Sequence, residues 1–207
     1  MKVLVYGGAF NPPTRAHIDL SGSVRKKAGF DKVLFVPSKT TYIRIDQEKD
    51  GVFPDERRLA MLEAVAAVHP WMLVSDYEIT QASQPRTYQT LCHFRKQGMD
   101  CGLLIGADKL IELETGWRHV REIAHEFGIY CMQRDGLDLE RLISESAFLS
   151  DIREYIHLYP SPLSYQTASS SAIRARLREY EAIRKELMGM LPEELHDSMD
   201  EMAKEIA

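Results

Sequence analysis

The 207-residue sequence has few cysteines and little net charge. Its three cysteines, Cys92, Cys101 and Cys131, are odd in number and lack C-x-x-C spacing, so we expect neither a disulfide framework nor a zinc knuckle. They are typical of small core residues in a reducing compartment. The net charge of -5 argues against a nucleic-acid-binding protein, which normally has a basic face. A small anionic substrate remains compatible with that charge, because local arginines can bind it.

Long hydrophobic runs are also missing. The apolar stretch at the N-terminus spans about five residues, too few for a signal-peptide core or a membrane span. No internal repeat or low-complexity tract stands out. These absences predict a cytoplasmic protein with no membrane partner and no nucleic-acid partner. The length suits one sizeable domain, or one domain with a small appendage.

Short apolar runs instead alternate with longer amphipathic ones. This alternation predicts an α/β fold, a Rossmann-like doubly wound parallel sheet with helices on both faces. Crossovers in such a sheet are right-handed, and ligands bind at the carboxyl ends of the strands near the switch in strand order. The predicted strands are residues 3–6, 33–36, 72–75, 102–105 and 129–132, and the predicted helices are 16–27, 55–68, 87–97, 117–126 and 139–146.

The last forty or so residues differ from this pattern. We expect residues 1–180 to form the main domain and residues 181–207 to form a small C-terminal helical extension packed on it. A helix break is expected at Leu191-Pro192, since proline is well tolerated in a first helical turn. A coiled-coil or partner-binding helix is the alternative, and the sequence leaves the oligomeric state, including a homo-oligomer, open.

The segment "GGAFNPPTRAH", Gly7 to His17, connects the first predicted strand to the first helix. Its glycines allow another group to approach the backbone, Phe10 is a candidate anchor, and the helix start favours an anion. His17 lies about one turn into the helix and can point back toward that anion. The spacing matches neither the dinucleotide fingerprint nor the P-loop. A histidine without functional role is the alternative.

A second candidate anion site is "SSSAIR", Ser169 to Arg174. It has hydroxyls and backbone donors at a predicted helix start, with an arginine one turn later, which suits a phosphate tail. The alternative is an ordinary serine cap followed by a solvated arginine.

Together these segments resemble a known family. "GGAFNPPTRAH" is similar to the G-G-x-F-x-P-x-[HT]-x-x-H signature of the nucleotidyltransferase superfamily, and "SSSAIR" to its partner motif I-S-S-T-x-I-R. "VLFVPSK", "RRLAMLEAV", "IGADKLIELETGW" and "QRDG" resemble segments of the nicotinate or nicotinamide mononucleotide adenylyltransferases. The resemblance covers most of residues 1–178.

The resemblance implies that the phosphate of a pyridine mononucleotide attacks the α-phosphorus of ATP, usually with Mg²⁺ present, and that pyrophosphate leaves. His17 would donate to the α-phosphate and Thr14 would contact the same phosphates, while Ser170, Ser171 and Arg174 would hold the β- and γ-phosphates. Either Lys39 or Arg44, with Arg44 slightly favoured, would supply a further cation. The other implied nucleotide- or substrate-binding residues are Gly7, Gly8, Ala9, Phe10, Gly106, Asp108, Trp117, Thr87 and Arg134.

Several positions depart from the family pattern. Thr14 stands where many members have histidine, and Arg86 stands where they have tyrosine. For Asp108 a simple helix cap is the alternative, and for Trp117 a core residue is. Rival functions are a phosphopantetheine adenylyltransferase, a cytidylyltransferase, or a catalytically silent nucleotide-binding protein.

Overall fold

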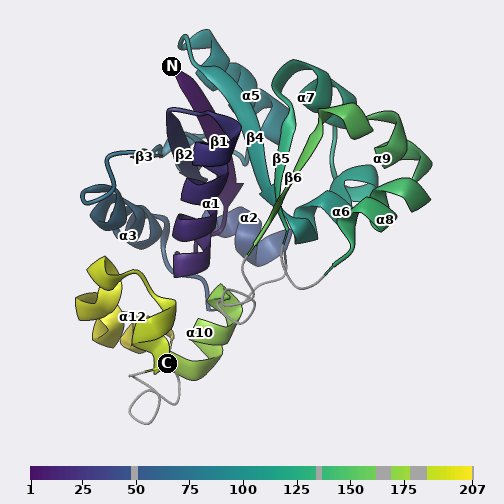
Figure 1. Cartoon of the computed structure of the whole chain (residues 1–207). Coiled ribbons are helices and arrows are strands. Elements are labelled where there is room, and N and C mark those ends of the chain that lie inside the picture. The colour runs from purple at the N-terminus through teal and green to yellow at the C-terminus, as the bar shows by residue number, and fades with distance from the viewer. Residues whose placement is uncertain (48–50, 134–136, 162–168, 178–185, 207) are drawn as a thin grey trace.

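A six-stranded, all-parallel sheet forms the centre of the protein (Figure 1). The computed structural model describes residues 1–47, 51–133, 137–161, 169–177 and 186–206. The strand order is β3-β2-β1-β4-β5-β6, which is the order of a doubly wound α/β fold. The strands are β1 (Lys2–Gly8), β2 (Lys32–Pro37), β3 (Met72–Val74), β4 (Asp100–Gly106), β5 (Ile129–Gln133) and β6 (Ile156–Pro160).

Helices cover both faces of this sheet. On one face lie α1 (Arg15–Ala28) and α3 (Asp55–Ala66). On the other lie α5 (Thr87–Lys96), α6 (Ala107–Gly116), α7 (Val120–Phe127), α8 (Leu139–Glu145) and α9 (Ala147–Asp151). The short elements α2 (Thr40–Ile45), α4 (Tyr77–Thr80) and η1 (Arg153–Tyr155) lie in the connections.

The strands are apolar along their length because both of their faces are buried. In β1, Leu4 and Tyr6 belong to the cluster under α1 and α3, whereas Val3 and Val5 belong to the cluster under α5 to α9. Successive side chains of a strand point to opposite faces, so one short segment supplies both cores. The predicted fold class is therefore confirmed.

All five predicted strands are present, but β6 was not predicted. Its sequence, IHLYP, contains a histidine and a proline, and it pairs only with β5 at the edge of the sheet. The prediction of a helix beginning at Trp117 was wrong. Trp117 is the C-cap that follows α6, and α7 begins only at Val120, after His119 adopts a left-handed conformation with φ 61°.

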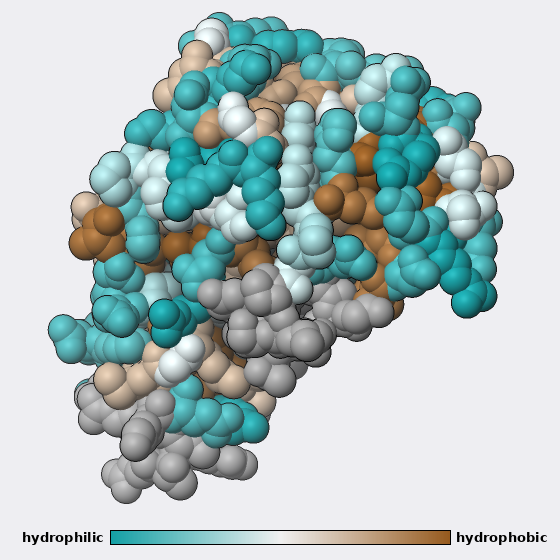
Figure 2. All heavy atoms as spheres, in the orientation of Figure 1, coloured by the Kyte–Doolittle hydropathy of each residue, from teal (hydrophilic) through white to brown (hydrophobic). Residues whose placement is uncertain are grey.

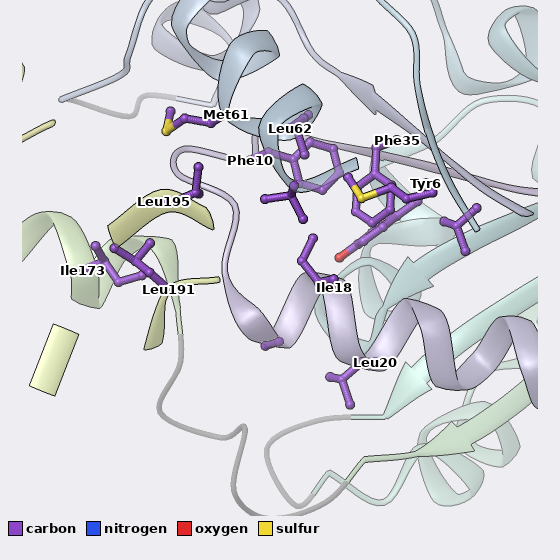
Figure 3. Close-up of a cluster of buried hydrophobic side chains, with 14 of the residues drawn as sticks. Tyr6, Phe10, Ile18, Leu20, Phe35, Met61, Leu62, Ile173, Leu191 and Leu195 are labelled. Atoms are coloured by element: carbon purple, nitrogen blue, oxygen red, sulfur yellow. The ribbon is translucent and has the colours of Figure 1, made fainter. Parts of the chain in front are cut away.

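The C-terminal residues pack on the α1 and α3 face. Described elements there are α10 (Ser170–Leu177), a helical stretch at 186–190, η3 (Glu193–Ser198) and α12 (Met199–Ile206). Ile173, Leu191 and Leu195 are buried in the same cluster as Phe10 and Met61 (Figure 3). The expected break at Leu191-Pro192 is present, since η3 begins directly after the proline. The expected boundary at residues 180/181 lies outside the described residues.

Ionisable side chains also link this C-terminal part to α3 and the residues that follow it. Arg57 Nη2 forms an ion pair with Glu201 Oε2 over 2.7 Å, and beyond the C-terminal end of α3 His69 Nε2 lies 3.5 Å from Glu194 Oε1. On the face drawn in Figure 2, hydrophilic residues are interspersed with small hydrophobic patches, one of them on the side of β6 and α6. Within the described ranges, no helix has the length and apolarity needed to cross a membrane.

Candidate active site

The carboxyl ends of β1 and β4 lie next to each other at the centre of the sheet (Figure 1). α1 follows β1 onto one face, and α6 follows β4 onto the opposite face. In a sheet of this order, ligands bind in the crevice where the two connections diverge. Gly7, Gly8 and Gly106 end these strands with an exposed or half-buried backbone. The structure therefore brings together at this crevice the three glycines that were predicted to bind nucleotide.

The loop after β1 folds back on the end of its own strand. A Cβ on Gly8 would lie 3.1 Å from the Phe10 ring, so any larger residue there would have to displace the buried ring by a few tenths of an ångström. Phe10 is 2% exposed, and its ring packs against Tyr6 and Phe35 at centroid distances of 5.2 and 5.3 Å (Figure 3). Its backbone φ of 44° is unusual for a residue other than glycine. Such strain persists only where the surroundings hold it, and it is concentrated at functional sites.

Thr14 and His17 form a reciprocal cap at the start of α1. The His17 backbone N–H donates to Thr14 Oγ1 over 3.3 Å, and the Thr14 backbone N–H donates to His17 Nδ1 over 2.9 Å. Thr14 Oγ1 also lies 3.0 Å from Nδ1. Because Nδ1 accepts a hydrogen bond from a backbone N–H, a neutral imidazole must carry its proton on Nε2. The cap therefore selects one tautomer of the half-buried His17.

The serine-arginine segment makes direct contact with the same loop. Ser170 Oγ donates to the Pro12 carbonyl over 2.8 Å, and Arg174 Nη1 donates to the Asn11 carbonyl over 2.7 Å. Arg174 Nη2 lies 3.3 Å from Ser171 Oγ. Burial lowers the pKa of Arg174 from its ordinary value, but an arginine remains charged at neutral pH. Two motifs separated by more than 150 residues thus meet at one end of the sheet.

The two candidate cations that follow β2 both donate to backbone carbonyls. Lys39 Nζ bonds the carbonyl of Gln81 over 2.7 Å and also that of Ile79. Arg44 Nη2 bonds the Val52 carbonyl over 3.0 Å. The geometry therefore gives each of them a structural contact and does not favour one over the other as a phosphate ligand.

At the end of β4, Asp108 and Trp117 lie at opposite ends of α6. Gly106 is the N-cap of α6 and Asp108 is the acidic residue of its first turn, so Asp108 is not itself the N-cap. The exposed Asp108 instead folds back over Gly106, where a Cβ would lie 2.5 Å from Oδ1. Trp117 is half-buried and packs on the apolar cluster of the α6 face.

The remaining predicted residues lie near the start of α5. Thr87 is its half-buried first residue, and the exposed Arg86 precedes it, with the Arg86 N–H donating to Gln89 Oε1 over 2.8 Å. Arg134 lies outside the described residues. Among the residues that the structure places, no group of three or more His, Cys, Asp or Glu side chains could hold a metal ion.

Three buried polar residues beside the site were missed from the sequence. Asn11 Oδ1 accepts the Phe53 N–H over 2.9 Å, and Asn11 Nδ2 donates to the Gly51 carbonyl over 3.1 Å. Arg58 is fully buried, and Glu78 is 5% exposed. Burial is the main cause that raises the pKa of Glu78, although the Thr90 hydroxyl donates to its Oε1 over 2.7 Å. The only sequence signal for Arg58 was its apolar helical neighbourhood, "RRLAML".

Comparisons with known proteins show the family to which this chain belongs. The chain belongs to the cytidylyltransferase-like family, whose pattern matches residues 5–176. It is 28% identical over 200 residues to a probable nicotinate-nucleotide adenylyltransferase of Clostridium acetobutylicum, covering 95% of this chain and 94% of the relative. It is 29% identical over 189 residues to the nicotinamide/nicotinic acid mononucleotide adenylyltransferase of Oryza sativa, covering 82% and 74% of the two chains.

A solved structure shares the fold at greater sequence distance. It is the Plasmodium falciparum nicotinic acid mononucleotide adenylyltransferase complexed with APC, with a TM-score of 0.70 and 16% identity, and the match covers 92% of this chain and 90% of the other. A second structure of the same Plasmodium protein, complexed with NaAD, also has a TM-score of 0.70. The resemblance predicted from the two end motifs is thus confirmed.

Proposed function

We propose that this protein is an adenylyltransferase that joins the AMP part of ATP to a pyridine mononucleotide and releases pyrophosphate, a step of NAD biosynthesis. One observation carries the proposal, the contact of Ser170 and Arg174 with the carbonyls of Pro12 and Asn11. This contact brings two anion-binding motifs, which are far apart in the sequence, together at one end of the sheet. The names of the relatives, pyridine mononucleotide adenylyltransferases, support the same activity.

The site suits a reaction without a covalent enzyme intermediate. Displacement at phosphorus needs alignment of the reactants and neutralisation of charge, rather than a protein nucleophile. In this proposal His17 donates from Nε2 to the α-phosphate of ATP, because Nδ1 is occupied by the Thr14 N–H. A preorganised donor of this kind strengthens its bond as charge builds in the transition state. Ser170, Ser171 and Arg174 hold the β- and γ-phosphates.

The other predicted residues surround the two substrates. Gly7 to Phe10 and Gly106 line the nucleotide, Asp108 binds a ribose hydroxyl, and Trp117 presents a ring on which the pyridine stacks. Thr87 lies beside the mononucleotide. Either Lys39 or Arg44 supplies a further cation once it leaves its carbonyl partners.

Mg²⁺ belongs in this proposal as part of the ATP substrate. The site is made of hydroxyls, backbone donors and cations, which fits an ion brought by the triphosphate better than a carboxylate cage. When bound, the ion neutralises charge on the phosphate oxygens. The residues of this chain position the phosphates around it.

The decisive experiment measures pyrophosphate release by the purified protein. ATP is supplied with nicotinate mononucleotide, nicotinamide mononucleotide, phosphopantetheine or choline phosphate in separate reactions, and CTP replaces ATP in a parallel set. We expect turnover with ATP and a pyridine mononucleotide only. Turnover with phosphopantetheine or with CTP would transfer the assignment to one of the rival enzymes, and no turnover with any pair would indicate a silent nucleotide-binding protein.

Arg86 is our candidate for choosing between the two pyridine substrates. It is exposed at the start of α5, next to Thr87, and its guanidinium can pair with a carboxylate but not with a carboxamide. Arg86→Ala should therefore lower the preference for the nicotinate over the nicotinamide substrate. An unchanged ratio of the two kcat/KM values would remove Arg86 from specificity.

We also propose a reducing, cytoplasmic location on the basis of the cysteines. All three are free, and burial raises the pKa of Cys131 to about 12 and that of Cys101 to about 11. Buried protonated thiols are unreactive and are typical of proteins that do not form disulfides.

A further inference from the structure

Arg58 is the most completely buried charged residue in the part of the chain that the structure describes. It lies in the first turn of α3 with 0% of its surface exposed. Burial lowers its pKa, and the nearby carboxylate of Asp55 opposes that shift. A buried arginine is costly unless its donors are satisfied, so its bonds indicate what it holds in place.

Those bonds converge from three segments of the chain. Nη1 donates to the Ala9 carbonyl over 2.7 Å, and Nε donates to the Phe53 carbonyl over 3.2 Å. Nη2 donates to the Ser38 carbonyl, to Thr40 Oγ1 over 3.3 Å and to Asp55 Oδ1. One guanidinium thus joins the loop after β1, the segment after β2 and the start of α3.

The bond to Ala9 determines where the next amide points. In a planar trans peptide the C=O of Ala9 and the N–H of Phe10 point in opposite directions. Because Arg58 draws the Ala9 carbonyl toward α3, the Phe10 N–H is turned to the other side of the loop. Among the residues that the structure describes, no backbone carbonyl accepts a hydrogen bond from that N–H.

The same hydrogen bond from Arg58 helps to hold the strained backbone of Phe10. Its φ of 44° is held from one side by the Ala9–Arg58 bond and from the other by the buried ring (Figure 3). The adjoining peptide is also fixed, since the Ser38 N–H donates to the Gly8 carbonyl over 2.9 Å.

We propose that Arg58 is a positioning residue that aims the Phe10 N–H at the phosphates of bound ATP. The proposal rests on the proposed function in taking ATP as the ligand. Arg58 does not touch the substrate. It acts by fixing the carbonyl of the same peptide, and neither a point charge nor a surface pair could hold three segments in this way.

Arg58→Lys tests the proposal because it keeps the charge and loses the planar five-donor fork. We expect the Kd of a non-hydrolysable ATP analogue to rise about tenfold and kcat/KM for ATP to fall roughly 10²-fold, as for a misplaced catalytic contact. The KM for the mononucleotide should change less than about threefold. Binding of the analogue should slow hydrogen exchange at the Phe10 amide in the wild type but not in the variant.

Arg57→Lys is the matched control. Arg57 is the adjacent residue of α3, but it is half-buried and pairs with Glu201 over 2.7 Å and with Glu205 over 3.4 Å, both in α12. For Arg57→Lys, the Kd of the analogue, kcat/KM for ATP and the exchange of the Phe10 amide should stay within about twofold of wild type, because the charge is kept and pairs with solvent-accessible glutamates contribute little. Arg58→Lys with wild-type Kd and kcat/KM for ATP would overturn the proposal. So would a wild-type Phe10 amide that gains no protection from the analogue.

If Arg58→Lys fails to fold, Asp55→Asn serves as the alternative variant for the same test. The amide keeps the Oδ1 acceptor that receives the Thr40 N–H over 2.7 Å and removes only the charge that holds the guanidinium. A roughly fivefold rise in the Kd of the analogue is expected, corresponding to one weakened hydrogen bond, and an unchanged Kd overturns the proposal. The binding and exchange experiments need no mononucleotide, so they remain informative if the wild-type protein transfers adenylate to none of the acceptors.

Discussion

Replacing Thr14 by valine separates a capping role from a direct contact with phosphate. Thr14 is 0% exposed, and its hydroxyl accepts the His17 N–H and lies against His17 Nδ1. Valine has nearly the same shape, so no cavity forms. The change removes one hydroxyl and leaves the packing, and its effect can therefore be assigned to the lost hydrogen bonds.

The expected loss of stability follows from the cap. Removing an N-cap hydroxyl costs about 0.5–2 kcal/mol, and the complete burial of Thr14 places this site toward the upper end. We expect a decrease of about 1–2 kcal/mol in the free energy of unfolding. For a chain of this size that lowers the melting temperature by about 2–8 °C, measured by calorimetry. Thr14→Ser, which keeps the hydroxyl, should recover most of it.

We expect Thr14→Val to lose less activity than His17→Ala. In Thr14→Val the backbone N–H of residue 14 still donates to Nδ1, as it does over 2.9 Å in the native protein, so the proton stays on Nε2. One weakened bond corresponds to a fall in kcat of about tenfold or less. His17→Ala, which removes a transition-state donor, should lower kcat roughly 10²–10³-fold.

Two results would refute this reasoning. A Thr14→Val protein with the wild-type melting temperature would show that the cap contributes nothing. A variant as inactive as His17→Ala would show that the Thr14 hydroxyl contacts the phosphates directly, as the resemblance implies, and that its bond to His17 is broken in the complex.

Three further outcomes are expected from other parts of the molecule. Arg174→Ala should raise KM for ATP more than KM for the mononucleotide, and equal increases would contradict the assignment of Arg174 to the triphosphate. Leu195→Ala should cost about 3 kcal/mol and about 6–12 °C in melting temperature, because its side chain is 1% exposed, while kcat measured well below that temperature stays near wild type. Glu78 has a raised pKa in the folded protein, so the stability it contributes is full below about pH 4.5 and is lost as the pH rises through that higher value. The urea midpoint of Glu78→Gln should therefore rise relative to that of the wild type as the pH increases from 4.5 to 8. A difference between the two midpoints that does not change with pH would contradict the burial of the charge.

The parallel α/β order of the central strands could be read from the sequence, and the two motifs that the sequence singled out are ones that the structure brings into contact. Apolar periodicity depends on residues close together in the chain, so the central strands, such as β1 with Val3 to Val5, were evident from it. The edge strand β6 was not, because His157 and Pro160 interrupt the apolar pattern and only pairing with β5 makes the segment a strand. Likewise, α6 was not among the predicted helices, and the helix predicted from Trp117 begins only at Val120.

By itself, the sequence singled out two segments that we predict to bind anions, the Gly7–His17 loop and the Ser169–Arg174 helix start. Only the tertiary structure decided that they touch, through Arg174 and Asn11, and that Arg58 holds the first of them from behind. The reason is physical. Glycine turns and helix caps are set by neighbouring residues, whereas the burial of a charge and its choice among five acceptors depend on segments brought together by folding.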